Sequence, residues 1–559
     1  MFDARNARNT KTLQNEATRK VVSVAIVESA LGTRAAAPAR FIRIAAAIWL
    51  PAAILAIFAI EAALFVPFAY LNRDEGWYTL SGRLAFDGHV PYRDFPYFQM
   101  PLVPYVFGGV QVLAGAHSIE FGRAAASALG VCTVVLVLYI ASRLGGALAG
   151  AVAGALVLSS VEFILASTTA RAEAVVLPLT MLAAALALRW PRGVAGFAGP
   201  PAVLLLATAA RLTFAPAFLA ALAYCWWRAR PSRRDVAAGL TLLLALAAVI
   251  ALPVALSPGH AWFDVWTAQA LRNDQFLERR PDLVETLTQR TLFLRLPAVV
   301  FFVVLVPLLF YASSLLHRWR EGWRPGRPGF EGDAATNHVL LVAYAVLLWL
   351  PFAGFDHQEA RYFVPPFALL SIVAAEVVVR ARAGLLDATM RHLPAAFALI
   401  FAVHLVFQVP ALADSLDRDD LSQTRAAGAT IASLAGDGQI VALNPTLAVA
   451  SGRPLPAPLV MGQFSLWGRF GEQRARESGV VNVRMLEREM LDPRTRVVAL
   501  DDYDLSVIAA FREEDRHVPA DAAWPFKLFP SLIGRYEVAK RVDHFGQFNA
   551  TLYVLARVG

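Results

Sequence analysis

Long apolar runs constrain this chain more than any other feature of its sequence. Residues 44–65, 236–256 and 296–315 are almost entirely apolar, and 236–256 and 296–315 carry no charged side chain. About 20 apolar residues in a helix that rises 1.5 Å per residue cross the roughly 30 Å hydrocarbon core of a bilayer. These runs therefore predict a polytopic membrane protein built from α-helices.

The overall composition agrees with that prediction. Of 559 residues, 57% are hydrophobic and 17% are charged, whereas a soluble globular protein carries about a quarter charged residues. The net charge is +8, and the arginines lie in short loops between apolar runs. A nucleic-acid-binding face would instead mix basic residues with aromatic ones on a soluble surface, so the sequence indicates a membrane and no nucleic-acid partner.

The apolar runs predict about eleven spans, and the fifth and sixth are interrupted by prolines and an arginine. The predicted spans are 44–66, 119–142, 146–164, 172–188, 195–209, 212–227, 236–256, 292–315, 337–353, 363–380 and 394–410.

The basic loops predict the orientation. With the tail 1–43 in the cytoplasm, nearly every short arginine cluster falls on the cytoplasmic side, as the positive-inside tendency requires. The chain is then a multi-pass protein of a bacterial inner membrane. The opposite, periplasmic side receives the loops 72–117 and 257–289 and the C-terminal segment 411–559. The arginine clusters are 142–143, 189–192, 228–234, 317–327 and 380–391.

The C-terminal segment has the composition of a soluble domain. Strand-like stretches at 439–443, 496–500 and 551–556 alternate with helical ones, which predicts a small α/β domain. The expected fold is thus an all-α transmembrane domain over 44–410, followed by an extracytoplasmic α/β domain over 411–559.

Ionisable residues in or beside the spans are informative, because a charge within a bilayer is costly. On the predicted topology they lie in the outer halves of spans or at their outer boundaries, with Glu376 as the exception. Snorkelling toward the interface would account for single arginines, but the set mixes acids and bases, which favours a polar cavity open to the outer side. The set is Glu61, Arg123, Glu162, Arg171, Glu173, Arg211, Arg295 and His404.

The first outer loop is the densest polar cluster. Asp74 and Glu75 directly follow the first span, so they are expected at the membrane surface. Asp74 could instead cap a short helix over 75–86. Capping leaves unexplained the aromatic and proline residues that follow, and a further carboxylate at Asp94.

Several motifs in this loop resemble the first outer loop of GT-C glycosyltransferases. They are DEGWY from Asp74, GHVPYRD ending at Asp94 and QMPLVPY from Gln99. The pattern is closest to the family 39-like enzymes related to protein O-mannosyltransferases and to the lipid A aminoarabinose transferase. RAAAS from Arg123, ARAE before the fourth span and HQEARYFVPP before the tenth extend the resemblance over 44–410.

The resemblance implies transfer of a hexosyl or pentosyl group from a polyprenyl-phosphate donor to the hydroxyl of a lipid, glycan or protein acceptor. Asp74 matches the family position of the catalytic base, with Glu75 beside it, and such a base takes the acceptor proton as the new bond forms. A single base without a covalent nucleophile would invert the anomeric centre.

The departing phosphate needs fixed positive charge, which arginine supplies because its planar fork of donors matches phosphate oxygens. Arg211 and Arg361 are the first candidates, with Arg171 and Arg272 behind them; an ion pair with Glu173 is an equal alternative for Arg171. Further substrate contacts are expected from Asp94, His89, Tyr92, Gln99, His357 and Tyr362.

No spacing typical of a metal site occurs in the sequence. Some GT-C enzymes use a divalent cation and relatives of the O-mannosyl type are thought not to, so no cofactor is assigned and a divalent cation is left open. The run DDYD at 501–504 resembles an Asp-x-Asp element, but it follows a predicted strand, which favours a solvated turn.

Two other functions compete with glycosyl transfer. A transporter or flippase of lipid-linked sugars would place its polar groups near the membrane midplane and interrupt its helices there. A non-catalytic subunit for envelope assembly would use the C-terminal domain as its working surface. The ionisable residues at the outer helix ends and the acidic outer loop favour the transferase.

Overall fold

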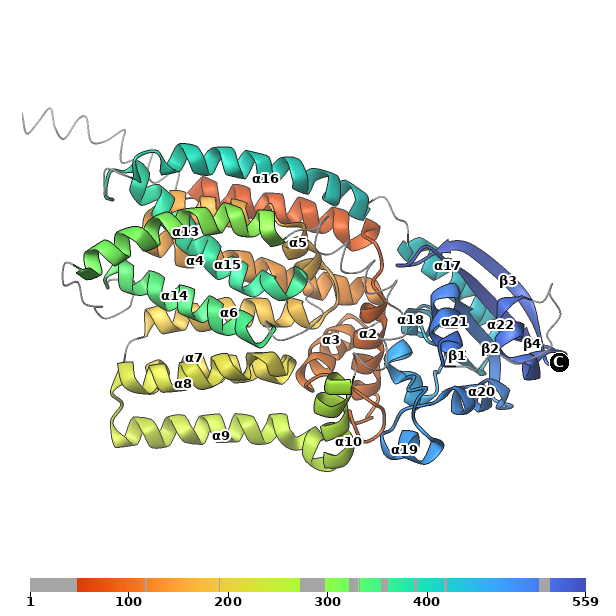
Figure 1. Ribbon diagram of the computed structural model, residues 1–559. Coiled ribbons are helices and arrows are strands. Elements are labelled where there is room, and N and C mark those ends of the chain that lie inside the picture. Colours follow the sequence, from red (N-terminus) through yellow and green to blue (C-terminus); the bar gives the residue numbers. More distant parts are fainter. Residues whose placement is uncertain are drawn as a thin grey trace, which may run out of the picture.

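The computed structural model describes residues 48–115, 118–190, 192–271, 297–320, 330, 332–352, 360–386, 390–416, 420–511 and 523–559. A long helical bundle ends against a smaller α/β domain, and the C-terminus lies in that domain (Figure 1). The predicted tail 1–43 and the candidates Arg272, His357 and Arg295 lie outside the described residues.

Seven described stretches of helix are long and apolar enough to cross a membrane. This number is smaller than the eleven predicted spans for three reasons. The span 146–164 shares a helix with 119–142, and the spans 212–227 and 337–353 fall on helices of 15 and 16 residues. The span 292–315 begins outside the described residues, and its part Leu305–Leu316 is a shorter apolar helix. The seven are Ile48–Phe68, α4 (Ile119–Leu158), α6 (Ala172–Arg189), α7 (Gly193–Ala210), α9 (Arg233–Leu256), Arg361–Arg382 with α15 (Val364–Arg382), and Leu393–Ala435, which contains α16 (Leu393–Leu416).

Other helices complete the bundle. Helices α2, α3 and α10 lie at the bundle end that faces the α/β domain (Figure 1). The bounds are α2 (Arg73–Phe86), α3 (Leu102–Ala114), α5 (Val161–Thr168), η1 (Leu212–Phe214), α8 (Ala215–Ala229), α10 (Pro258–Trp262), the π-helical turn η2 (Phe263–Thr267), α13 (Pro297–Arg320), α14 (Ala334–Trp349), η4 (Leu350–Phe352) and η5 (Ala360–Phe363).

Helix α4 is a hairpin of two helices joined at Gly146, as the separate predicted spans 119–142 and 146–164 require. Gly146 has φ 82° and ψ 175°, a backbone conformation that glycine adopts readily. The second arm packs closely on the first: a Cβ atom at Gly150 would lie 3.1 Å from the carbonyl oxygen of Leu138. The predicted third span also continues past α4, into α5.

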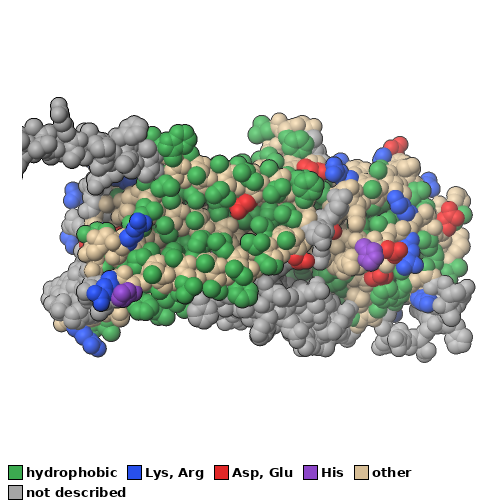
Figure 2. Space-filling view, turned by 90° about the horizontal axis from the view of Figure 1, so that it is seen from above, with side chains coloured by type: hydrophobic (Ala, Val, Ile, Leu, Met, Phe, Trp, Pro, Cys, Tyr) green, Lys and Arg blue, Asp and Glu red, His purple; other side chains and the backbone are tan. Residues whose placement is uncertain are grey.

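The surface of the bundle suits lipid. Large apolar side chains are exposed along its helices, and one face is covered with hydrophobic side chains over most of its length (Figure 2). Lys and Arg side chains lie at the end of that face far from the α/β domain (Figure 2). Because water would strongly disfavour so large an apolar surface, the chain is an integral membrane protein.

The C-terminal domain contains one four-stranded sheet in the order β1-β2-β4-β3. β1 and β2 are parallel, whereas β4 is antiparallel to both β2 and β3. The three predicted strands are confirmed as β1 (Gln439–Ala442), β2 (Thr495–Asp501) and β4 (Ala550–Arg557). The sequence missed β3 (Tyr536–Phe545), an edge strand whose residues are mostly polar and exposed.

Alternating residues of the sheet face two different cores. Ile440, Val497 and Val554 pack in the same core as helix α17 (Asp420–Ala435) and the membrane bundle. Val498 and Leu555 face a second core, to which α20 and α21 also contribute apolar side chains. The remaining helices are α18 (Pro445–Ser451), η7 (Ala457–Leu459), η8 (Gly462–Ser465), α19 (Glu472–Glu477), α20 (Val483–Leu491), α21 (Asp502–Ala509), α22 (Trp524–Leu528) and η9 (Pro530–Leu532).

Candidate active site

A pocket of about 600 Å³ lies where the bundle meets the α/β domain. It is built mainly from helix ends and from the loops between them, and the α/β domain supplies one wall. The lining residues are Asp74, Trp77, Tyr78, Phe98, Gln99, Met100, Glu173, Arg211, Leu212, Thr213, Ala215, Pro216, Val265, Trp266, Ala268, Gln269, Ala270, Pro351, Arg361, Tyr362, Met461, Phe464 and Trp467.

Asp74 reaches the pocket from the first turn of α2. The alternative that Asp74 caps this helix is wrong: Asn72 is the N-cap, and its side chain accepts the backbone N–H of Asp74. The Asp74 carboxylate is therefore available for other partners. Its Oδ1 accepts from the indole Nε1 of Trp77 at 3.2 Å, and its Oδ2 accepts from Nη1 of Arg361 at 3.0 Å.

A second carboxylate, Glu173, comes from the first turn of α6 and is almost fully buried. Its Oε1 accepts from Nη1 of Arg211 and lies 3.7 Å from Nε of Arg361. Within the described part of the chain no ion pair joins Glu173 to Arg171, so that alternative is wrong. The ring of Tyr362 lies beside both guanidinium groups, at 4.5 Å from Arg211 and 5.7 Å from Arg361.

The pocket thus holds a chain of alternating charges: Asp74, Arg361, Glu173 and Arg211. Two guanidinium groups face one pocket, and each presents a planar fork of donors that suits phosphate oxygens. The side chains of Asp74 and Arg361 remain 16% and 18% exposed, so both can meet a ligand that enters the pocket. Such a set can bind an anion and accept a proton within the same small volume.

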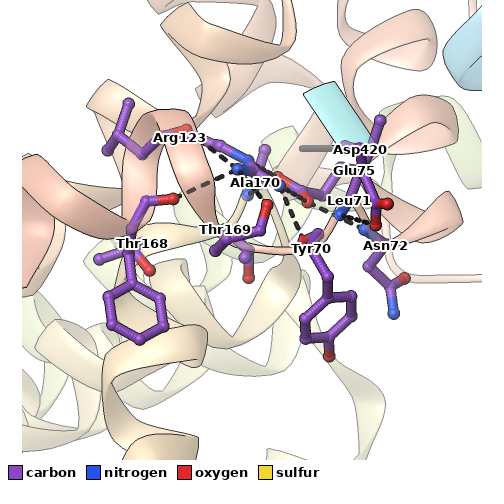
Figure 3. Close-up of polar contacts among 12 residues, drawn as sticks. Tyr70, Leu71, Asn72, Glu75, Arg123, Thr168, Thr169, Ala170 and Asp420 are labelled. Carbon is purple, nitrogen blue, oxygen red and sulfur yellow. Dashed lines mark hydrogen bonds and ion pairs between the residues drawn. The ribbon is translucent and has the colours of Figure 1, made fainter. Parts of the chain in front are cut away.

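Glu75, the second predicted catalytic carboxylate, lies elsewhere. Among the described residues, the pocket lining does not include it, and its side chain is fully buried. Both of its oxygens accept from Arg123 at 2.8 Å, and Oε2 also accepts the backbone N–H of Ala170 (Figure 3). Glu75 also completes the capping box of α2 with Asn72, so its place in the structure is that of a buried anchor.

Arg123 explains why this anchor is needed. Its guanidinium also donates to the backbone carbonyls of Val66, Ala69 and Tyr70, where the helix Ile48–Phe68 ends. The last carbonyls of a helix have no partner within it, so a buried cation there satisfies them and balances Glu75. Of the ionisable residues that the sequence predicted around a polar cavity, Glu173 and Arg211 line the pocket, whereas Arg123 does not.

The other predicted contacts divide into two groups. Gln99 and Tyr362 line the pocket. Tyr92 is buried and its hydroxyl donates to the backbone oxygen of Gln99, which makes it a support of the loop. Asp94 and His89 lie away from the lining: Asp94 bonds to Arg93, which lowers the pKa of the Asp94 carboxyl to about 2, and His89 is exposed.

Arg171 is buried at the N-cap of α6, outside the lining residues, and interacts electrostatically with Asp74 and Arg361. Its Nε and Nη2 atoms find no hydrogen-bond acceptor among the described residues. Buried polar groups usually have a hydrogen-bond partner, and an anion bound beside Arg171 could accept from these donors.

The sequence had suggested that the run Asp501-Asp502-Tyr503-Asp504 is a solvated turn, and this prediction is wrong. Asp501 and Asp504 are buried, form the capping box of α21 and bond to Arg73. Within the described part of the chain, no group of three His, Cys, Asp or Glu side chains could hold a metal ion. The buried arginine takes the place that a cation would need at this run.

Several lining residues had no assigned role in the sequence. Glu173 belongs to one of the GT-C-like motifs, so its signal was present, but only the fold shows that it lies between two arginines. Trp77 belongs to the first motif and donates to Asp74. No sequence signal marks Met461, Phe464 and Trp467 of the α/β domain, because their role depends on how that domain packs against the bundle.

Comparison with solved structures identifies the class of fold. No protein-family model and no curated protein matches the sequence. ArnT from Cupriavidus metallidurans in the apo state matches with a TM-score of 0.53 at 14% identity, over 91% of this chain and 97% of that one. The chain therefore shares the fold of ArnT, in agreement with the fold that the motifs had predicted.

Two further structures are similar. ArnT bound to undecaprenyl phosphate has a TM-score of 0.52 at 15% identity, again over 91% of this chain and 97% of that chain. The oligosaccharyltransferase AglB from Archaeoglobus fulgidus, in complex with an inhibitory peptide and a dolichol-phosphate, has a TM-score of 0.47 at 13% identity, over 83% and 71%.

Proposed function

We propose that this protein is a membrane glycosyltransferase that moves a sugar from a polyprenyl-phosphate carrier to an acceptor hydroxyl. One observation carries the proposal: Asp74, whose carboxylate is partly exposed, shares a pocket with two arginines at the ends of membrane helices. The fold adds support, since ArnT shares it and one ArnT structure holds undecaprenyl phosphate.

Asp74 is the proposed general base. The acceptor oxygen attacks the anomeric carbon of the sugar while the bond from that carbon to the phosphate oxygen breaks. The acceptor proton passes to Asp74, and the polyprenyl phosphate leaves with the bonding electron pair. Such a base contributes about 10²–10⁴-fold to the rate. Attack in a single displacement inverts the anomeric centre.

Arg211 and Arg361 are the proposed phosphate ligands. A phosphate that enters would compete with Glu173 and Asp74 for both guanidinium groups, since these now pair with the two carboxylates. Release of Asp74 from Arg361 would also leave its Oδ2 atom open to the acceptor hydroxyl, so donor binding would prepare the base. Arg171, with its unsatisfied donors, is the proposed third cation at this site.

The sequence leaves the use of a divalent cation open, and experiment can decide it. Both pocket carboxylates, Asp74 and Glu173, accept from arginine, and a cation bound between them would have to displace those contacts. Transfer measured before and after treatment with a chelator, with magnesium or manganese added back, decides whether a cation takes part.

The position of the pocket favours a transferase over a transporter. Its charged groups come from the first turn of α6, the end of α7 and the turn η5 before α15, and the α/β domain closes one side. A transporter would hold its substrate near the midplane, between interrupted helices.

The test uses the purified full-length protein and a panel of polyprenyl-phospho-sugars, with released polyprenyl phosphate as the readout. We expect release with at least one donor, and Asp74→Asn should lower it about 100-fold or more. Asp87→Asn is the matched control, because Asp87 ends the same helix with half of its side chain exposed.

Each result has a defined meaning. Full transfer by Asp74→Asn would show that this carboxylate is not the base. Binding of a lipid-linked sugar without release, together with its movement across vesicle membranes, would favour the flippase alternative. No binding of any donor would contradict both.

A further inference from the structure

Arg73, the neighbour of Asp74, points away from the pocket and into the α/β domain. Its guanidinium donates to Asp501 at 2.9 Å, to Asp504 at 2.7 Å and to the side-chain oxygen of Gln463 at 2.8 Å. The rings of Tyr503 and Phe548 lie 5.0 Å and 5.9 Å from it. The side chain is almost fully buried, so a single residue joins α2 to three separate segments of the α/β domain.

The backbone just before Asp74 is bound to the C-terminal part of the chain as well. The N–H of Tyr70 donates to the carbonyl of Ser415, and the N–H of Leu71 donates to Asp420 at 3.0 Å (Figure 3). The N–H of Arg73 donates to the side chain of Gln547.

Helix α2 also packs tightly on α18 of the α/β domain. A Cβ atom at Gly76 would lie 2.3 Å from the backbone nitrogen of Thr446, so the two helices meet without an intervening side chain. The segment 70–76 therefore takes its position from the α/β domain on one side and from the Glu75–Arg123 pair on the other.

The same α/β domain forms a wall of the pocket. Met461, Phe464 and Trp467 line the cavity that Asp74 enters. The indole of Trp467 packs edge-on against Phe98 at 6.4 Å and Phe263 at 5.3 Å. Gln463, which accepts from Arg73, lies in this wall, so Arg73 connects the helix of Asp74 directly to the surface opposite it.

The chemistry of the cluster requires a guanidinium. Burial raises the pKa of Asp504 to about 7, with Arg73 opposing the shift and Asp501 adding to it. Lysine would bring the charge but not the fixed fork that reaches three acceptors at once. Loss of the cation would leave two carboxylates of the same turn buried without compensation and would remove the ion pairs that join α2 to the α/β domain.

We propose that Arg73 is a positioning residue, which sets the wall 461–467 of the α/β domain against Asp74 and so makes that domain part of the substrate pocket. This inference rests on the proposed transferase function for its activity readout. The α/β domain then contributes to transfer because it shapes the pocket around Asp74, in addition to any contribution to stability.

The activity test compares Arg73→Lys and Arg73→Met with Arg425→Ala. Arg425 pairs with Glu120 across the same two parts of the protein, but the two side chains are 64% and 35% exposed and lie outside the pocket. We expect Arg73→Met to lower kcat about 100-fold, with KM changed much less, as expected for misplaced reacting groups. Arg73→Lys should recover part of the loss, and Arg425→Ala should retain full activity.

Amide hydrogen exchange tests the proposal without a sugar donor, because it measures the protein alone. In Arg73→Met, amides of 74–80 and 461–467 should exchange faster, while the central strands β2 and β4 stay protected. Unchanged exchange in both segments would overturn the proposal, whatever the activity. Full transfer by Arg73→Met would overturn it even if Asp74→Asn is inactive, so the two proposals fail separately. Loss of protection throughout the sheet would show that the residue serves stability alone.

Discussion

Asp74 and Glu75 are neighbours on one helix, yet they face different environments. Successive residues on an α-helix point about 100° apart, because a turn holds 3.6 residues. Asp74 therefore faces the pocket, whereas Glu75 turns into the protein and meets Arg123. The two positions look equivalent in the sequence motif. Only their different angular positions around the helix axis separate the proposed catalytic carboxylate from the structural one.

Glu75→Gln should destabilise the protein strongly. It leaves the charge of Arg123 buried without its partner, and the loss of one member of such a pair costs about 3–5 kcal/mol. Thermal unfolding of the purified protein measures the effect, with Asp87→Asn expected to match the wild type. An unchanged unfolding temperature combined with lost transfer would return Glu75 to a catalytic role.

Glu173→Gln should strengthen the binding of undecaprenyl phosphate by about tenfold, equivalent to about 1.4 kcal/mol. The carboxylate now occupies the two arginines that we assign to the phosphate, so its removal leaves them more available. Calorimetric titration with the lipid measures this change, and Glu120→Gln at the start of α4 is the control. Weaker binding would mean that Glu173 orients the arginines instead of competing for them.

At the level of elements, α10, η2 and the helical residues 268–271 that follow them hold the loop that lines the pocket. His260 contacts the backbone oxygen of Tyr92 through Nδ1, Asp264 accepts the backbone N–H of Tyr97, and Gln269 donates to the carbonyl of Phe98. Tyr92 itself has a positive φ of 69°, a conformation that costs energy for a tyrosine. Side chains from one element thus fix the backbone of another, next to the residues that enter the pocket.

Asp264→Ala should loosen this loop and lower transfer. Asp264→Asn should retain both the loop conformation and the transfer activity, because an amide oxygen can still accept the backbone N–H of Tyr97. Burial raises the pKa of Asp264 well above its ordinary value, so the folded protein holds a proton that the unfolded chain releases. The resulting stability is present at low pH and is lost as the pH rises through the raised pKa. Thermal unfolding across a pH series should therefore show a slope that Asp264→Asn flattens.

Asp94→Asn is the control for this pH dependence. The pKa of Asp94 is lowered, so its contribution is lost only when the pH falls toward about 2, outside the range of the series. An unaltered pH slope in Asp264→Asn would contradict the assignment of the slope to Asp264.

For the whole molecule, the arrangement of charge predicts the orientation in the membrane. Arginines lie at the bundle end far from the α/β domain (Figure 2), as expected for a cytoplasmic face. The pocket and the α/β domain lie together at the other end. Transfer would then take place on the outer side of the membrane.

Cysteine labelling tests this orientation. In a variant with Cys132 and Cys225 replaced by alanine, Asp437→Cys in the α/β domain should react with a membrane-impermeant maleimide in right-side-out vesicles. Arg230→Cys, in the turn between α8 and α9, should react only in inside-out vesicles. Both positions are exposed in the structure. The reverse pattern would place the pocket in the cytoplasm.

The sequence by itself determined the membrane class, the long apolar helices, three of the four described strands and the motifs that contain Asp74, Glu173 and Arg361. These follow from local properties, since the transfer of a side chain into lipid and the alternation of a strand depend on neighbouring residues. The polar strand β3 lacked such a signal, because an exposed edge strand needs no apolar pattern.

The tertiary structure alone decided which charges meet. Glu75 pairs with Arg123, Glu173 lies between Arg211 and Arg361, and Arg73 reaches Asp501, 428 positions along the chain. A charge in a low-dielectric interior must find a partner, but the sequence does not specify which one, because that depends on how distant segments pack. For the same reason, only the folded chain shows that the α/β domain closes the pocket around Asp74.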